Sequence, residues 1–285
     1  MNIFQWFLNL FKKKEVPKVE INFGEATRKA VFVAANNYSF NPLRGCINDV
    51  QELWKKLFEE IYGFKCVTVL EEQETKTNFM DALNKLVDNA KEDDSLVFMY
   101  SGHGTSVADN DGDEEDGRDE ALYLRDGSTV RDDEIRVILD KLPKNVKLTF
   151  ISDSCYSGTI SRAFLNTMND NSFYSVPKFM PPSDDMDAVC INSLPLKKTM
   201  FYPEEDMNHV TLSGTNSSTY SWDANIDGKY FGAFSYYAVK VLIEKPDMTY
   251  TEFGERIKAF LPSSKYSQYP QVEGKKENKD KKVFC

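Results

Sequence analysis

The sequence has few cysteines and histidines and no excess of positive charge. Its five cysteines form no closely spaced pair, which argues against a disulfide framework and against a zinc cluster. Lysine and arginine (35) are outnumbered by aspartate and glutamate (45), and the net charge of −10 argues against nucleic acid as a partner and favours a cationic substrate. The odd number of thiols fits a reducing compartment, so we expect a cytoplasmic protein.

The first 14 residues are apolar and aromatic up to Phe11 and end in three lysines. This run is too short to span a bilayer. The positive charges follow it rather than precede it, which argues against a secretory signal. Two interpretations stay open. The segment is either a helix or loose end beside the domain, or an interfacial anchor that makes peripheral membrane contact through its aromatic residues and lysines.

Apolar patterns of two kinds alternate along the chain. Continuous apolar runs are typical of buried parallel strands, and here they lie at 30–35, 66–70, 95–100, 147–152 and 209–213. Periodic apolar positions predict helices at 50–61, 79–90, 132–142, 231–243 and 249–261. This order predicts an α/β fold with a mostly parallel central sheet and helices on both faces.

Two short motifs, whose central residues are 52 positions apart, follow two of these strands. One is Ser-Gly-His-Gly around His103, and the other is Asp-Ser-Cys-Tyr-Ser-Gly around Cys155. Adjacent parallel strands would carry both side chains to the same edge of the sheet, where ligand sites of such folds lie. A cysteine nucleophile beside a histidine base is the pair that acyl transfer needs. The backbone amides of Gly104 and Cys155 are natural oxyanion donors.

Each member of this pair has an ordinary explanation when taken alone. A cysteine after a strand is usually a small buried hydrophobe, and a histidine between glycines can be structural. The chain has only two histidines, and the other, His209, opens a later strand and is the weaker candidate for the base. The two motifs together favour a catalytic dyad, and nothing marks a third catalytic residue.

The two motifs resemble those of the caspase-like cysteine peptidases and, within them, the metacaspases of the type I or bacterial kind. The resemblance covers 28–158 well and 209–273 more loosely. It implies a caspase-like three-layer sandwich and a cysteine endopeptidase that uses His103 and Cys155. Tyr156 stands where many relatives carry histidine. That position does not supply the base, so we expect activity despite the difference.

The resemblance also implies a substrate pocket made by Cys46, Asp49, Ser101 and Asp153. The two carboxylates would hold a guanidinium or ammonium group, so the expected substrates are proteins or peptides with arginine or lysine before the scissile bond. Ordinary roles are the alternative: Asp49 as a charge at a helix N-terminus, and Asp153 as a turn former. Strand alternation places Asp153 on the side of Cys155, which favours the pocket.

An acidic loop at 109–120 carries eight carboxylates. Oxygen ligands at such density favour calcium or magnesium, although Glu114 stands where an EF-hand loop needs glycine. The resemblance implies a calcium site that includes Asp119, Asp132 and Asp133. A further aspartate of the family is Arg162 in this chain, which opposes a cation. A solvated acidic loop is the alternative, and calcium as a cofactor stays an open hypothesis.

The resemblance divides the chain into an N-terminal segment and linker, a peptidase domain and a lysine-rich tail that we expect to be mobile. Their bounds are 1–27, 28–273 and 274–285. Within the domain, the large-subunit-like half, the linker and the small-subunit-like half are 28–165, 166–204 and 205–273. Basic residues in the stretch 159–208 suggest self-processing, and the candidates are Arg162, Lys178, Lys197 and Lys198. A monomer is the expected state.

Three other functions stay open at this stage. The first is an enzyme of the clostripain-like or separase-like branches with another substrate preference, since these share the order of histidine and cysteine. The second is a caspase-like pseudoprotease that acts by binding, which the intact pair of His103 and Cys155 opposes. The third is a membrane-associated adaptor that acts through 1–14.

Overall fold

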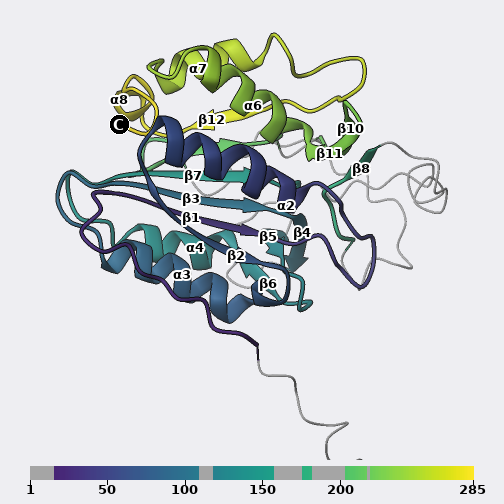
Figure 1. Cartoon of the computed structure of the whole chain (residues 1–285), viewed down its shortest axis with the longest axis horizontal. Helices are drawn as coiled ribbons and strands as arrows, with labels where there is room; N and C mark the ends of the chain where they lie inside the picture. The colour runs from purple at the N-terminus through teal and green to yellow at the C-terminus, as the bar shows by residue number, and fades with distance from the viewer. Residues whose placement is uncertain (1–15, 109–117, 157–174, 182–202, 217–218) are drawn as a thin grey trace, which may run out of the picture.

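The computed structural model describes residues 16–108, 118–156, 175–181, 203–216 and 219–285. Figure 1 shows a central six-stranded sheet with the strand order β12-β9-β7-β3-β1-β2. Its strands are β1 (Arg28–Ala34), β2 (Lys65–Leu70), β3 (Ser95–Ser101), β7 (Lys147–Asp153), β9 (Val210–Ser213) and β12 (Gln271–Glu273). Only β12 is antiparallel to its neighbour within this sheet, so the prediction of a mostly parallel sheet is confirmed.

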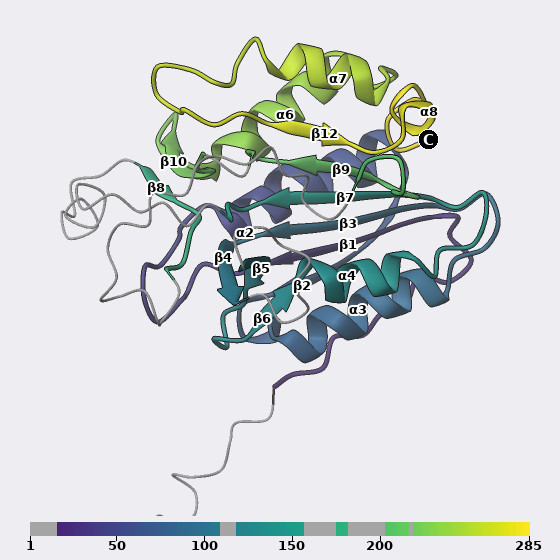
Figure 2. The ribbon, with the colours of Figure 1, turned by 180° about the vertical axis from the view of Figure 1, so that it is seen from behind.

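Helices cover both faces of the sheet (Figures 1 and 2). One face carries α3 (Lys76–Asp88) and α4 (Asp132–Leu139). The other carries the helical segment that begins with α2 (Cys46–Asn48), continues as π-helix through Asp49–Trp54 and Leu57–Ile61, and lies beside α6 (Ala233–Glu244) and α7 (Tyr250–Ile257). These layers form the caspase-like three-layer sandwich that the sequence predicts.

Successive side chains of the central strands alternate between two apolar layers. On β1, Phe32 packs with Trp54 and Phe58 in the layer under α2 and α6. Its neighbours Val31 and Val33 face the opposite layer, which α3 and α4 close. Because both faces of β1 and β3 are buried, these strands need the continuous apolar runs from which they were predicted.

Two small sheets extend the carboxyl edge of the main sheet. One contains β4 (His103–Ala108), β5 (Arg118–Tyr123) and β6 (Thr129–Arg131), and the other contains β8 (Ser175–Pro177), β10 (Trp222–Ile226) and β11 (Lys229–Gly232). The turn between β10 and β11 has positive φ at Asp227 (53°) and Gly228 (87°). Asp-Gly is the usual sequence of such a hairpin turn. This hairpin was not predicted from the sequence. The predicted helix at 231–243 includes the last two residues of β11, whereas α6 begins at Ala233.

The C-terminal segment is not a mobile tail, and that expectation is wrong. Val283 and Phe284 are buried in the layer that holds Phe58, and the backbone N–H of Phe284 donates to the hydroxyl of Tyr250. The lysines around them, with the short helix α8 (Lys276–Lys279), suggested a solvated end. The adjacent apolar pair instead anchors the segment, because burying two such side chains contributes roughly 3–6 kcal/mol.

The helix ends differ in detail from the predicted ranges. Thr75 caps α3, since its hydroxyl accepts from the backbone N–H of Asn78. Ile61 was assigned to a buried helix face but is 43% exposed, and the predicted ends at 142 and 261 overran α4 and α7 by three or four residues. Within the described residues, no helix is both long and apolar enough to cross a membrane. The apolar segment 1–14 lies outside the described residues.

Candidate active site

Strands β3 and β7 lie side by side at the centre of the sheet and lead into the two motifs. They pair in parallel with Ser101 opposite Asp153. His103 and Cys155, two residues further along each chain, therefore leave the same edge of the sheet, and both are fully buried. The structure brings the imidazole and the thiol to one edge, as the sequence predicted.

The imidazole of His103 is held in one orientation by a neighbouring loop. Its Nε2 lies 2.7 Å from the carbonyl oxygen of Asn41. A carbonyl can only accept, so Nε2 carries the hydrogen and Nδ1 keeps its lone pair. Nδ1 is buried and has no hydrogen-bond partner among the described residues. Tyr38 packs edge-on against the ring, with 4.5 Å between centroids. Burial lowers the pKa of His103 to about 4, so the ring is a neutral base.

The thiol of Cys155 is buried at the same edge of the sheet as His103. Its Sγ is 4.0 Å from the carbonyl oxygen of Ser221. Burial raises the pKa of this thiol, because the surroundings disfavour the thiolate. The residues after Tyr156 lie outside the described part of the chain. In the described state the cysteine and the histidine are both neutral.

The cover over both groups is a residue of the chain itself, Lys178. Its carbonyl oxygen accepts hydrogen bonds from the backbone N–H of Gly104 (2.9 Å) and of Cys155 (3.2 Å). These are the two amides predicted as oxyanion donors, and they converge on one carbonyl. Gly104 must be glycine here, because a Cβ would lie 2.1 Å from the carbonyl oxygen of Cys155.

The ammonium group of Lys178 is fully buried in the predicted acidic pocket. Its Nζ lies 2.9 Å from Asp49 Oδ2, 3.1 Å from Asp153 Oδ2 and 3.0 Å from Ser101 Oγ. Three acceptors thus meet the three N–H donors of the lysine. Gly232 closes the pocket from β11, since a Cβ there would lie 2.4 Å from Nζ. A side chain at Gly232 would occupy the place of the ammonium.

Fixed hydrogen bonds orient both carboxylates of the pocket. Asp49 accepts from Ser101 Oγ (2.8 Å) and from the backbone N–H of Gly232 (2.7 Å). Asp153 accepts from the hydroxyls of Ser221 and Ser235, each at 2.6 Å. Burial raises the pKa of Asp49 to about 7. Burial alone would lower the pKa of Lys178, but the nearby carboxylates of Asp153 and Asp49 outweigh it, so the pKa of Lys178 lies above its usual value and the ammonium stays charged.

Cys46, the fourth predicted pocket residue, is also fully buried beside these groups. Its thiol is close enough to hydrogen bond with Ser101, and burial raises its pKa. It therefore lines the pocket as a neutral side chain. The structure brings all four predicted pocket residues together around one cation.

The residues before Lys178 lie in an extended conformation against β10. Pro177 is opposite Trp222, Val176 is opposite Asp223, and the pairing is antiparallel. The N–H of Lys178 donates to the carbonyl oxygen of Ser221 at 2.8 Å. A peptide bound as an added antiparallel strand is a common mode of peptide recognition. The chain thus fills its own cleft.

Sequence reasoning named Lys178 only as one of four basic residues in a linker, and it missed Asp223 entirely. Asp223 is buried on β10, directly across from Gly232. One oxygen accepts from the backbone N–H of Arg44 at 2.6 Å, and the other has no hydrogen-bond partner among the described residues. The Asp-Gly turn that follows β10 was the signal that could have placed Asp223 on a strand beside the pocket.

The predicted calcium ligands do not assemble a site within the described residues. Asp119 lies on β5, and its carboxylate is 3.0 Å from the guanidinium of Arg131. Asp132 and Asp133 begin α4, where they favour the helix dipole. In the described ranges no three histidine, cysteine or acidic side chains are grouped as metal ligands. Residues 109–117 and Arg162 lie outside those ranges, so calcium stays a prediction.

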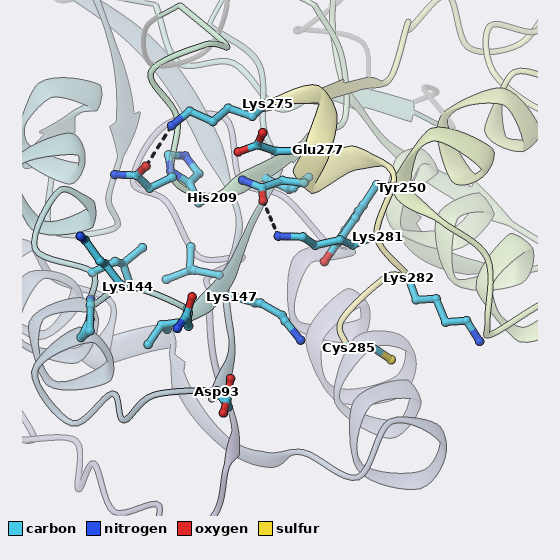
Figure 3. Close-up of a pocket in the computed structure, with 18 residues that line it drawn as sticks. Asp93, Lys144, Lys147, His209, Tyr250, Lys275, Glu277, Lys281, Lys282 and Cys285 are labelled. Atoms are coloured by element: carbon cyan, nitrogen blue, oxygen red, sulfur yellow. Dashed lines mark hydrogen bonds between the residues drawn. The ribbon is translucent and has the colours of Figure 1, made fainter.

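A separate cavity of about 630 Å³ lies at the opposite end of the sheet (Figure 3). It is bounded by the amino ends of β7 and β9 and by the C-terminal segment, with Lys147, His209 and Cys285 in its wall. A strand rises about 3.3 Å per residue, so Lys147 and Asp153 lie roughly 20 Å apart. His209 therefore has no part in the site around Cys155.

Comparison with known proteins identifies the family. Residues 28–163 match the family model described as "Metacaspase, peptidase C14 domain". Metacaspase-1 of Scheffersomyces stipitis is 32% identical over 86% of this chain and 70% of its own length, and Metacaspase-1 of Kluyveromyces lactis is 31% identical over 86% and 65%. A crystal structure of protein GSU0716 from Geobacter sulfurreducens, 23% identical, superposes with a TM-score of 0.66 over 90% of this chain and 98% of that one, which supports the fold. The chain belongs to the metacaspases, a family of caspase-like cysteine peptidases.

Proposed function

We propose that this metacaspase is an endopeptidase that cleaves after lysine or arginine, with Cys155 as nucleophile and His103 as base. We propose further that the bond between Lys178 and Phe179 is its first substrate. One observation supports both statements. Lys178 holds its ammonium between two carboxylates while its carbonyl oxygen lies against the amides of Gly104 and Cys155.

The geometry supports the following first step. The Sγ of Cys155 gives its proton to Nδ1 of His103 and forms a bond to the carbonyl carbon of Lys178. The negative charge that develops on the carbonyl oxygen is stabilised by the two backbone amides that already donate to it. The imidazolium then protonates the nitrogen of Phe179, and the peptide C–N bond breaks. The product is a thioester between Cys155 and Lys178.

Water completes the reaction. His103 takes a proton from the water that attacks the thioester carbonyl, and the thiol of Cys155 leaves with that proton. The asparagine carbonyl on Nε2 keeps the ring in the tautomer that leaves Nδ1 free in both steps. Until this happens Lys178 blocks the pocket, so we propose that the uncut chain is latent toward other proteins.

Intact mass spectrometry tests the proposal. The purified chain, incubated at neutral pH, is expected to yield two fragments separated between 178 and 179, whereas Cys155→Ala stays whole, with a loss in rate of at least about 10⁴-fold. The same preparation should cleave a fluorogenic Ser-Val-Pro-Lys peptide and its arginine counterpart, but not the aspartate counterpart.

Two variants at the cleavage site serve as controls. Lys178→Arg keeps a cation for the pocket and should still be cut, while Lys178→Met should not be cut at this bond. A wild-type chain that cleaves the lysine peptide yet never cuts itself would refute self-processing. Cleavage after aspartate alone would refute the role of the acidic pocket.

The pH dependence of self-cleavage should reveal the buried base. Because burial lowers the pKa of His103 to about 4, the ring is neutral at any higher pH, and the first-order rate should fall only below about pH 5. Once the segment around Lys178 has left the cleft, water reaches the imidazole of His103. For added peptides, the midpoint on the acidic side of the pH–rate profile should therefore move toward 6.5, the usual pKa of histidine. Equal midpoints for the two reactions would contradict this assignment. Protonation of Asp49 leaves Asp153 on the ammonium, so it should not release Lys178.

No step of this mechanism passes through a metal. Calcium activation is a hypothesis that rests on the family resemblance and on the acidic composition of 109–120. Arg131 neutralises Asp119 in the described residues, which opposes a cation at that position. Membrane contact through 1–14 and a monomeric state likewise stay proposals.

A further inference from the structure

The two residues that follow the proposed scissile bond are held as firmly as Lys178. Phe179 is fully buried and Met180 is 4% exposed. Recognition of a lysine needs nothing beyond its own carbonyl and ammonium. The burial of two further side chains therefore points to a second recognition element on the leaving-group side.

Backbone hydrogen bonds fix this side of the cleft. The N–H of Met180 donates to the carbonyl oxygen of Gly104 at 2.8 Å, and the N–H of Gly104 donates to the carbonyl oxygen of Lys178. Gly104 thus bonds to residues on both sides of the scissile bond and pairs in parallel with Phe179. A leaving segment bound in this way keeps its nitrogen close to the groups that must protonate it.

Asn41 connects the leaving segment to the base. Its side-chain amide donates to the carbonyl oxygen of Phe179 at 3.3 Å, while its backbone carbonyl oxygen accepts from Nε2 of His103. Asn41 has a φ of +52°, a left-handed conformation that asparagine tolerates better than most residues. One loop residue therefore positions both the imidazole and the peptide unit after the scissile bond.

The side chains meet an apolar wall. The ring of Phe179 lies edge-on to Tyr220, with 6.3 Å between centroids and an angle of 60°. Tyr220 precedes Ser221, whose carbonyl lies over the Cys155 thiol, so this wall adjoins the nucleophile. Met180 packs into the apolar layer that contains Leu43 and Cys46. Both contacts exclude water from the leaving-group side.

We propose that Gly104, Asn41 and Tyr220 form a subsite that selects substrates with a large apolar residue directly after the scissile lysine or arginine, followed by a second apolar residue. This inference rests on the proposed endopeptidase function and adds the leaving-group half of the substrate to it. Tyr220 sets the preference, and Asn41 acts as a positioning residue. Binding energy on this side acts while the C–N bond breaks, so it raises kcat/KM for that step.

Internally quenched peptides test the subsite. Ser-Val-Pro-Lys-Phe-Met and Ser-Val-Pro-Lys-Gly-Met, otherwise identical, are compared on the wild-type chain after the incubation that allows self-cleavage between 178 and 179. The Phe-Met peptide is expected to show a kcat/KM about 10–100-fold higher, the value of burying one large apolar side chain. In Tyr220→Ala the ratio of the two kcat/KM values should fall toward one. Tyr269→Ala, at a tyrosine that is 46% exposed, should keep the wild-type ratio.

Two other results would overturn the subsite in different ways. Equal rates for the two peptides on the wild-type chain would refute it and leave cleavage after lysine intact. Failure to cleave either peptide would refute the endopeptidase function together with the subsite. A ratio that survives Tyr220→Ala would remove Tyr220 from the selection.

Discussion

Asp153→Asn is expected to lower kcat/KM for lysine and arginine peptides by about 10²–10⁴-fold, because it removes one charge from a buried, hydrogen-bonded ion pair. The carboxylate of Asp153 lies 3.1 Å from the ammonium and accepts from two serine hydroxyls, Ser221 and Ser235. An asparagine at this place must turn an N–H₂ group toward either the ammonium or a donor, so it loses more than a charge. Steady-state kinetics with the matched lysine, arginine and aspartate peptides measures the effect.

The matched control for this prediction is Asp81→Asn. Asp81 is a half-exposed aspartate of α3 whose carboxylate pairs with Lys85 on the surface, and its loss should leave all three rates within about twofold. Thermal unfolding of both variants separates a lost pocket from a lost fold. If Asp153→Asn kept wild-type rates on folded protein, the acidic pocket would have to be assigned elsewhere.

The sequence was sufficient for the parts of the site that local pattern determines. Buried parallel strands read as continuous apolar runs, so the ends of β3 and β7 could be located without coordinates. Once these strands are neighbours, His103 and Cys155 must leave the same edge. The family resemblance then supplied Cys46 and Asp49, which lie far from both motifs along the chain and which no periodicity connects to them.

The parts that were missed depend on contacts between distant segments. Lys178 lies in a proline-containing stretch with no period. Its position is fixed by the pocket around Asp49 and Asp153 and by backbone hydrogen bonds to segments far away in the sequence. The burial of the C-terminal pair Val283 and Phe284 was not predicted, because the many lysines beside them make the segment as a whole look solvent-exposed. Asp223 faces the pocket only because β10 pairs with β11, and its hairpin turn is short.

The cleft is filled by a lysine of the same chain, and this explains why three charged side chains can be completely buried in it. Asp49, Asp153 and Lys178 have no exposure to solvent. Each would be costly to bury alone, and together they satisfy one another only while the segment stays in place. Cutting the bond after Lys178 would free this segment, and the pocket would exchange one internal lysine for water or for a lysine or arginine of another protein.

Lys178→Met, made in Cys155→Ala so that no cleavage occurs, is expected to lower the free energy of unfolding by about 3–5 kcal/mol at pH 9, because it leaves two buried carboxylates without their cation. The loss should shrink as the pH falls toward 7. Burial already raises the pKa of Asp49 to about 7 in the presence of the ammonium. Without the ammonium this pKa rises further, so the folded variant takes up a proton that the unfolded chain does not bind, and its relative stability increases as the pH falls.

Chemical denaturation at pH 9 and pH 7 measures both values, with Lys56→Met in the same background as the control. Lys56 is an exposed lysine of the helical segment before Leu57, and its replacement should change the free energy of unfolding by less than about 0.5 kcal/mol at either pH. A small loss for Lys178→Met that does not depend on pH would mean that water already screens the pocket. The ammonium would then contribute little to holding the segment in the cleft, and the latency of the uncut chain would have to depend on the backbone hydrogen bonds around Gly104 and β10.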